Sequence, residues 1–251
     1  GVNIVRNRAK QHVETDFEAK PGILKMSWGQ KPKPLEREID YMNTVFGANY
    51  TYWPRQKVQE FYSTSRYNDA VFNPHGFQLH SLNYLLRCAD KAEQLGGKIF
   101  ENTAVTKLSK TSSGYRITSK NGFIHASKVV VCISASQTNL NYKLFRSILP
   151  IGTYVLLTEP LNGRLKDVIR APFAVSDSRR VENYYRPLKT TQILWGGGIS
   201  TRQNPAMLKK KMLRNLLSVY PQLAGIKAEL AWPGTMGYAR HGMPQIGRLN
   251  D

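Results

Sequence analysis

The segment from residue 73 to residue 136 constrains the fold more than any other part of the chain. Between Leu79 and Leu95 apolar residues recur at helical spacing, and Gly96-Gly97 follows at once. This pattern predicts an amphipathic helix that ends at the glycines. Its apolar face consists of Leu82, Leu85, Leu86, Ala89, Ala92 and Leu95.

The residues after this helix predict a series of short strands. We expect strands at 98–101, 105–109, 115–119, 123–126 and 128–133. The third and fourth alternate across Lys120-Asn121-Gly122, and an Asn-Gly pair is a strong signal for a β-hairpin. The fifth is a continuous run of apolar, mostly β-branched residues, which is typical of a strand buried on both faces. The predicted order is therefore helix, strand, hairpin and buried strand.

The first 72 residues are mixed and turn-rich. The chain begins without Met, and residues 1–6 have the pattern of the middle of a strand, so we expect a piece of a longer protein. Lys31-Pro32-Lys33-Pro34 predicts an extended spacer, because each proline disfavours a helical conformation in the residue before it. Helices are expected at 35–46 and 54–62.

The second half of the chain has a different pattern. Strands are expected at 154–158, 184–186 and 192–196, and a helix at 206–220 that ends before Pro221. Alternating strands with long gaps favour an antiparallel sheet. The whole sequence therefore predicts a mixed α/β (α+β) protein of two interleaved domains.

The charge of the chain admits two interpretations. There are 36 Lys and Arg residues against 17 Asp and Glu, a formal net charge of +19, which would attract nucleic acid or other anions. The densest cluster, Lys209-Lys210-Lys211 with Arg214, falls on the predicted 206–220 helix. Because no nucleic-acid-binding motif accompanies the charge, we favour a solvated basic surface over a specific nucleic-acid interface.

Cysteine and histidine usage argues against disulfides and metal sites. Cys88 and Cys132 are the only cysteines, and both fall in apolar runs, so we expect two buried, reduced thiols. The five histidines show no metal-ligand spacing. No apolar run is long enough to span a membrane, and no signal peptide is evident. A soluble cytoplasmic protein is expected.

In this order, the motifs resemble the flavin-dependent oxidoreductases of the D-amino-acid oxidase family. Four segments carry the resemblance: the helix entry 76–80, the strand-turn-strand 97–105, the hairpin and following strand 121–136, and substrate-domain landmarks at 148–152, 159–161, 184–187, 232–234 and 244–247. The resemblance implies a partial Rossmann-like FAD-binding domain (73–142 and 233–251) interleaved with an antiparallel substrate domain (1–72 and 143–232).

The resemblance also assigns cofactor-binding residues. It places Ala104 and Val105 at the adenine end of FAD, and Gly247 near the flavin. Ser134-Ala135-Ser136 would lie against the pyrophosphate, where a turn with small side chains lets backbone N–H groups approach a phosphate. The sequence contains no Gly-x-Gly-x-x-Gly and stops soon after Gly247, so we expect a fragment that lacks the first βαβ unit and the last flavin loop.

The substrate residues follow from the same alignment. The family's amino-acid oxidases hold the substrate carboxylate with an arginine, and Met236 stands at that place, although Arg240 could supply the charge. This favours oxidation of the C–N bond of a γ-glutamylputrescine-like amine to an imine or aldehyde, with oxygen or a carrier accepting the electrons. Tyr184, Tyr185 and Trp232 are candidates for an aromatic wall around the amine, or alternatively for core residues.

Two other functions remain open. The chain could be an amino-acid oxidase or dehydrogenase of the same family. It could also be a non-catalytic remnant, or a basic binding protein that uses its charge. No catalytic side chain is assigned, because the cofactor carries the redox chemistry in such enzymes.

Overall fold

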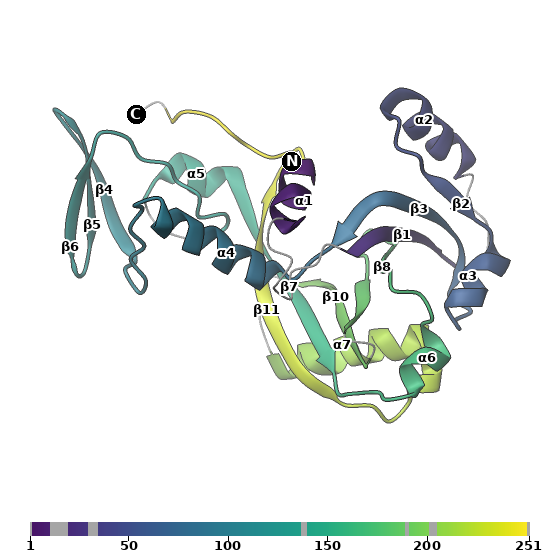
Figure 1. The fold of residues 1–251 in the computed structure, drawn as a ribbon. Coiled ribbons are helices and arrows are strands. Elements are labelled where there is room, and N and C mark those ends of the chain that lie inside the picture. Colours follow the sequence, from purple (N-terminus) through teal and green to yellow (C-terminus); the bar gives the residue numbers. More distant parts are fainter. Residues whose placement is uncertain are drawn as a thin grey trace. The chain divides into compact units, whose positions relative to one another are not determined.

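The computed structural model describes residues 2–10, 20–29, 35–136, 140–188, 191–200 and 205–249. The expected spacer at 31–34 and His12 lie outside these residues. The chain divides into two compact units (Figure 1). Unit 1 comprises 1–90, 153–199 and 203–233, and unit 2 comprises 91–152, 200–202 and 234–251.

Helices and strands are interspersed along the described chain. The helices are α1 (Val2–Lys10), α2 (Glu36–Phe46), α3 (Arg55–Phe61), α4 (Ser81–Gln94), α5 (Tyr142–Ser147), α6 (Arg164–Val168), α7 (Pro205–Val219) and the 3-10 helix η1 (Pro221–Leu223). The strands are β1 (Lys20–Trp28), β2 (Thr51–Trp53), β3 (Tyr67–Gln78), β4 (Val105–Thr111), β5 (Gly114–Ser119), β6 (Gly122–Ala126), β7 (Ile148–Thr158), β8 (Ala174–Asp177), β9 (Tyr184–Leu188), β10 (Gln192–Ser200) and β11 (Ala228–Ala239).

The strands form one large and one small sheet. The large sheet has eight strands in the order β11-β7-β10-β9-β8-β1-β3-β2, and most of it belongs to unit 1. Its β1–β8 pair is parallel, whereas β1–β3, β2–β3, β8–β9 and β9–β10 are antiparallel. The small antiparallel sheet, β4-β5-β6, belongs to unit 2. This confirms the predicted mixed α/β class.

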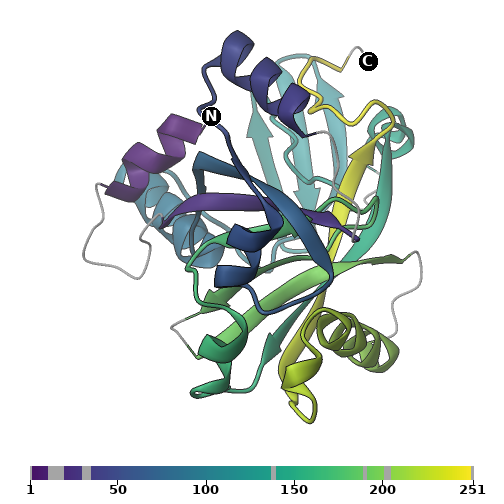
Figure 2. The ribbon, with the colours of Figure 1, turned by 90° about the vertical axis from the view of Figure 1, so that its right-hand side faces the viewer.

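The core of unit 1 lies on one face of the large sheet. Alternate strand residues such as Leu24, Leu156 and Ile193 are fully buried there, as expected for side chains on the same face. Leu216 of α7 joins the same cluster, and Figure 2 shows α7 running beside β10 and β11. The opposite face of the sheet is more exposed and carries the polar residues described below.

Three of the expected helices are confirmed with their ends. Helix α2 ends at Gly47, whose φ of 59° is the left-handed conformation of a glycine C-cap. Helix α4 ends just before Gly96, with φ of 86°, and α7 ends before Pro221. The expected short helix at 54–62 is α3.

The expected hairpin is confirmed, with a small shift of its turn. Ser119 pairs with Gly122, so the two-residue loop is Lys120-Asn121. Gly122 has a φ of 140°, and the amide of Asn121 donates to Oγ of Ser119. The glycine thus serves as the first residue of β6.

The expected strand at 128–133 is wrong. These residues form no strand, and Val130 is 84% exposed. Residues 98–101 also form no strand. A β-branched run becomes a strand only when a neighbour accepts and donates its backbone hydrogen bonds. No strand within the described ranges pairs with either segment.

Two further expectations for local structure are wrong. Residues 2–6 form part of helix α1, which is held by Arg6: its guanidinium donates to the His75 carbonyl and lies over the Phe77 ring. Cys132 is exposed and Cys88 is partly exposed, so neither thiol is buried. Cys132 is exposed because the segment that carries it is not covered by a sheet.

The apolar face of α4 is also exposed. Leu82, Leu85 and Leu86 are each more than half exposed, although their spacing correctly predicted the helix. No helix in the described part of the chain is long and apolar enough to cross a membrane.

Candidate functional site

Tyr184 lies on the exposed face of the large sheet. It begins β9 and is 39% exposed. Its ring covers Gly196 of β10, because a Cβ atom at position 196 would overlap the ring. The Tyr184 hydroxyl lies 3.3 Å from Oγ1 of Thr153 on β7. The tyrosine therefore spans from its own strand across β10 to β7, with its outer surface open.

Tyr185 lies on the opposite face, in the core of unit 1. Its ring stacks on Trp195 at 4.5 Å, and its hydroxyl lies 2.7 Å from the hydroxyl of Tyr220. Burial raises the pKa of both hydroxyls well above the usual value. The structure therefore places Tyr185 and Tyr184 on opposite faces of the sheet. This follows from strand geometry, because successive side chains point to opposite faces.

Arg186 shares the face of Tyr184 and was not identified from the sequence. It is half-buried, and its Nη1 donates to the Leu79 carbonyl at 2.9 Å. Burial lowers the pKa of its guanidinium. The sequence could have indicated Arg186, because a residue two positions after Tyr184 on the same strand shares its face.

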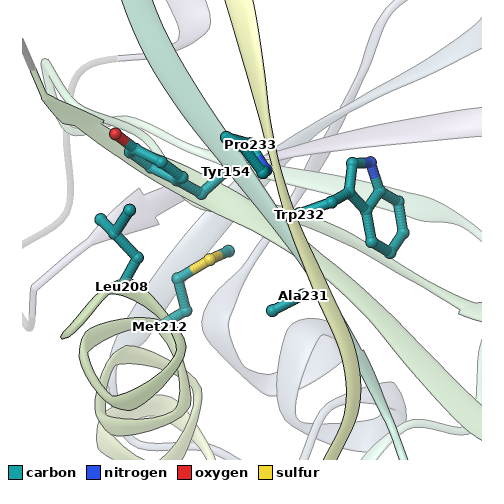
Figure 3. Close-up of a pocket in the computed structure, with 6 residues that line it drawn as sticks. All are labelled: Tyr154, Leu208, Met212, Ala231, Trp232 and Pro233. Atoms are coloured by element: carbon teal, nitrogen blue, oxygen red, sulfur yellow. The ribbon is translucent and has the colours of Figure 1, made fainter. Parts of the chain in front are cut away.

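Trp232 lies on β11 and is 44% exposed. Figure 3 shows its ring pointing away from Leu208 and Met212 of α7, whereas Ala231 points to the other side of the strand. The hollow that these residues line with Tyr154 has a volume of about 10 Å³, the room of a single water molecule. An organic amine does not fit into it.

The turn Ser134-Ala135-Ser136 has an unusual backbone. Ser134 has a φ of 51°, in the left-handed region that non-glycine residues seldom adopt. The amide of Ser136 closes the turn on the Ile133 carbonyl at 2.9 Å. Such outliers are more frequent at binding sites than in ordinary strand exits.

Within unit 2 this turn lies against Gly237 of β11. A Cβ atom at position 237 would lie 3.2 Å from Oγ of Ser134, 3.4 Å from the amide of Ala135 and 2.9 Å from Cγ2 of Ile148. The glycine thus allows β11 to approach the turn closely. Met236 precedes Gly237 on β11 and is partly buried.

The other candidate residues of unit 2 are more exposed. Ala104 is exposed and immediately precedes Val105, the first residue of β4, which is partly exposed. Arg240 lies in the turn after β11, and Gly247 lies beyond it; both are exposed. Met236 is next to Gly237 in the sequence, and no contact of the Ser134 turn with any of the four residues is recorded in the described ranges.

The residues of the turn suit an anionic cofactor group. Its small side chains and the left-handed serine are features of backbone anion sites, although Ala135 is buried with Gly237 against its amide, and the Ser136 amide already donates to the Ile133 carbonyl. In the described ranges no group of three His, Cys, Asp or Glu residues could hold a metal ion.

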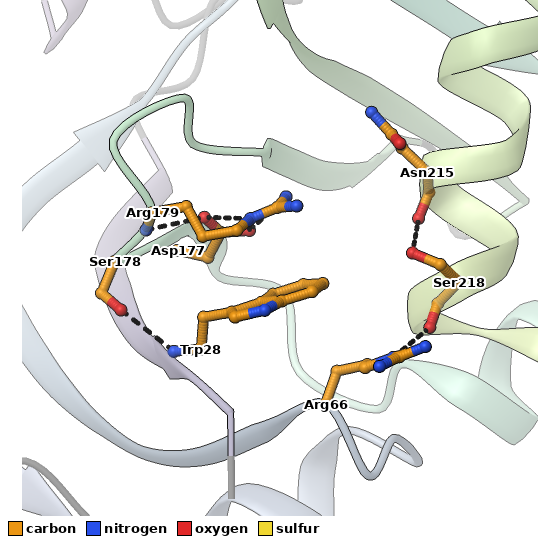
Figure 4. Close-up of polar contacts among 7 residues, drawn as sticks. All are labelled: Trp28, Arg66, Asp177, Ser178, Arg179, Asn215 and Ser218. Carbon is orange, nitrogen blue, oxygen red and sulfur yellow. Dashed lines mark hydrogen bonds and ion pairs between the residues drawn. The ribbon is translucent and has the colours of Figure 1, made fainter. Parts of the chain in front are cut away.

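A second polar cluster of unit 1 surrounds Trp28 (Figure 4). The Trp28 ring lies between two guanidinium groups, with Cζ of Arg179 at 3.8 Å and Cζ of Arg66 at 5.8 Å from its centre. Arg179 donates through Nε and Nη2 to the buried Asp177. Since Asp177 is held by Arg179, and Arg66 by the Ser218 carbonyl, the cluster has a structural role.

The whole chain, residues 1–251, matches the family model described as DAO, FAD dependent oxidoreductase. Over its full length it is 28% identical to the γ-glutamylputrescine oxidoreductase of Escherichia coli, covering 59% of that protein. It is 23% identical to a probable oxidoreductase, OrdL, of Haemophilus influenzae, covering 58% of it. The chain thus spans somewhat more than half the length of these relatives.

Solved structures show the same fold. The glycine oxidase of Geobacillus kaustophilus superposes with a TM-score of 0.79 at 16% identity, over 98% of this chain and 67% of that one. The L-proline dehydrogenase of P. horikoshii gives a TM-score of 0.77 at 16% identity, over 99% and 68%. By the family match over its whole length, the chain belongs to the DAO family of FAD-dependent oxidoreductases.

Proposed function

We propose that this chain is the substrate-binding part, with half of the nucleotide-binding part, of an amine oxidoreductase that acts on γ-glutamylputrescine-like amines. The observation that carries the proposal is the 28% identity to a γ-glutamylputrescine oxidoreductase over the whole chain. Met236 adds support, since a thioether cannot hold the α-carboxylate of an amino acid as an arginine does. The product would be an imine, which hydrolyses to an aldehyde, with oxygen or a carrier as the final electron acceptor.

We assign residues 73–142 and 233–251 to the nucleotide-binding domain, and 1–72 and 143–232 to the substrate domain. Within the first, Ala104 and Val105 would hold the adenine end of FAD, Ser134-Ala135-Ser136 the pyrophosphate, and Gly247 the flavin end. The left-handed Ser134 beside Gly237 supports the second of these roles. When bound, FAD supplies the hydride acceptor for C–N oxidation.

We assign Tyr184, Tyr185, Trp232, Met236 and Arg240 to substrate binding. In unit 1 the exposed Tyr184 and Trp232 offer aromatic surface to an alkylamine. Met236 of unit 2 is partly buried and offers an apolar side chain. Arg240 is the alternative cation for an anionic group. Tyr185 is buried and would not contact the substrate; its ring stacks on Trp195 of β10 and so helps to fix β9, which carries Tyr184.

The 251-residue chain by itself is expected to bind no stoichiometric FAD. It contains no Gly-x-Gly-x-x-Gly, the motif that supplies the main phosphate contacts in dinucleotide-binding domains. The test is the visible absorbance of the purified chain after incubation with excess FAD and gel filtration. A flavin band at one equivalent per chain would contradict this expectation.

The activity is tested on the full product of the gene that encodes this sequence. It is assayed with γ-glutamylputrescine, putrescine, glycine and L-proline, and aldehyde or keto-acid product is measured directly. The proposal expects γ-glutamylputrescine to have the highest kcat/KM. A preference for glycine or L-proline would instead favour an amino-acid oxidase or dehydrogenase, the activity named for the two structural neighbours above.

A non-catalytic basic protein is the second candidate, and the net charge of +19 is the observation that favours it. Binding to duplex DNA that falls steeply as salt is raised, together with no oxidation of any of the four amines, would support this candidate. If the protein oxidises an amine and binds DNA only weakly, without preference among DNA sequences, the positive charge is a solvated surface and not a specific nucleic-acid site.

A further inference from the structure

Arg186 projects from the same face of the large sheet as Tyr184. The two residues are separated by one position on β9, so their side chains lie on one side of the strand, about 7 Å apart along it. Tyr185 between them is 3% exposed and lies in the core, which fixes Arg186 on the side away from the core.

One edge of the Arg186 guanidinium has a buried donor without an acceptor. Nη1 donates to the Leu79 carbonyl at 2.9 Å. Nε is buried, and it has no hydrogen-bond partner in the part of the chain that the structure describes. The described residues also place no carboxylate in an ion pair with Arg186. A buried, unpaired donor on a cation is costly, so it requires an explanation.

The edge formed by Nε and Nη2 is the one with which arginine holds a carboxylate side-on. Arg179 uses this same edge in this chain: its Nε and Nη2 lie 3.1 Å and 2.8 Å from Oδ2 of Asp177. Arg179 has its carboxylate within the protein. Arg186 has no ion-paired carboxylate among the described residues: its Nε is buried without a partner, and the Leu79 carbonyl holds its Nη1.

We propose that Arg186 binds a carboxylate of the substrate, at the end remote from the amine that is oxidised, beside the Tyr184 ring. This rests on the proposed function and specifies its substrate class: an alkylamine that carries a distal carboxylate, as a γ-glutamyl group does. Arg186 then selects among amines by their distal carboxylate.

Binding to the 251-residue chain tests this without any flavin. The Nε–Hε signal of Arg186 is assigned in a ¹H–¹⁵N spectrum by its loss in R186K, and the unmodified chain is titrated with γ-glutamylputrescine and separately with putrescine. Only γ-glutamylputrescine, which has the carboxylate, should shift this signal. R186Q should weaken γ-glutamylputrescine binding by about tenfold or more and leave putrescine binding unchanged.

R170Q is the matched control, because Arg170 donates to the Glu60 carbonyl and to Oγ of Ser63 and should not affect either ligand. An Nε–Hε signal that does not respond to γ-glutamylputrescine would overturn the proposal, and so would equal losses for both ligands in R186Q. The signal of the unmodified chain keeps the test decisive even if R186Q fails to fold.

The two proposals fail in different ways. If the full gene product oxidises γ-glutamylputrescine with the same KM in its wild-type and R186Q forms, the proposed function stands and the role of Arg186 is refuted. If it oxidises no amine while the Arg186 signal still responds to the carboxylate, the carboxylate site stands and the proposed function is refuted.

Discussion

At the scale of single residues, the absence of a side chain at position 196 determines where the Tyr184 ring lies. The phenol needs the space directly above the β10 backbone, and its hydroxyl reaches Thr153 only from there. Gly196 does not have a left-handed φ, so its backbone conformation does not require glycine. Glycine is needed there because the Tyr184 ring occupies the space of a Cβ atom.

G196A should therefore displace the ring. We expect a loss of about 1–3 kcal/mol in the free energy of unfolding, as for other overpacked sites. Urea unfolding of G196A, Y184A and the double variant measures the coupling between the two positions. In the Y184A background the added methyl group should cost much less; an equal cost in both backgrounds would contradict this account.

A second residue-scale prediction concerns the Asp177 carboxylate, which holds Arg179. Asp177 is fully buried and accepts from Arg179, whose guanidinium lies on the Trp28 ring. D177A leaves that guanidinium without its acceptor, so we expect a loss of about 2–3 kcal/mol. D90A is the control, because the Arg87–Asp90 pair is exposed and such pairs contribute about 1 kcal/mol or less. Equal losses in both variants would be evidence against the role given to Asp177.

At the scale of elements, two helices with similar amphipathic patterns differ in burial. Helix α7 places Leu216 at 0% exposure, whereas α4 leaves Leu85 63% exposed. The hydrophobic period therefore identifies a helix and its apolar face, but not whether another element covers that face.

This difference predicts unequal effects of the same substitution. L216A should lower the free energy of unfolding by about 2–5 kcal/mol, the cost of a cavity in a core. L85A should change it by about 0.5 kcal/mol or less, as at an exposed position. Chemical denaturation of both variants compares them directly. A large loss in L85A would mean that α4 is covered in solution.

Local patterns predicted the elements whose signals are local. Helices α2, α4 and α7 and the β5–β6 hairpin follow from period, glycine ends and turn residues. Strands β1 and β3 did not follow, because Pro21-Gly22 and Pro74-His75-Gly76 are turn signals inside them. Those strands exist because β1 pairs with β3 and β8, and β3 pairs also with β2, which no local pattern reports.

The candidate site was predictable to a similar degree. Order and spacing pointed to the turn at 134–136 and to Tyr184. The left-handed φ of Ser134 and the unpaired Nε of Arg186 depend on tertiary contacts. The sequence could have assigned Tyr185 to the core face and Arg186 to the face of Tyr184, since adjacent strand residues point to opposite sides of a sheet.

At the scale of the whole molecule, several tyrosines are buried as neutral phenols. Burial raises the pKa of Tyr62, Tyr67, Tyr185 and Tyr220 above the usual value of 10.0. In the unfolded chain these hydroxyls lose their protons as the pH passes about 10, whereas in the folded chain they keep them. The stabilisation is therefore complete below pH 10 and is lost as the pH rises further.

The expected result is a free energy of unfolding that falls as the pH rises above about 10, measured by urea titrations at each pH. Y62F removes one phenol whose oxygen has no hydrogen-bond partner among the described residues. It should make the fall less steep at little cost near neutral pH. An unchanged slope in Y62F would refute its contribution.

The parallel pairing of β1 with β8 also has a consequence for synthesis of the chain. Ile23 lies beside Ala174 in the sheet, about 150 residues later in the sequence. At roughly 5–20 residues per second, a ribosome needs on the order of ten seconds to make the intervening chain. During that time one edge of β1 has no partner. The sheet that carries Tyr184 and Arg186 is completed only after this intervening chain has been made, so the nascent chain passes through a long period in which it can bind a chaperone or associate with other chains.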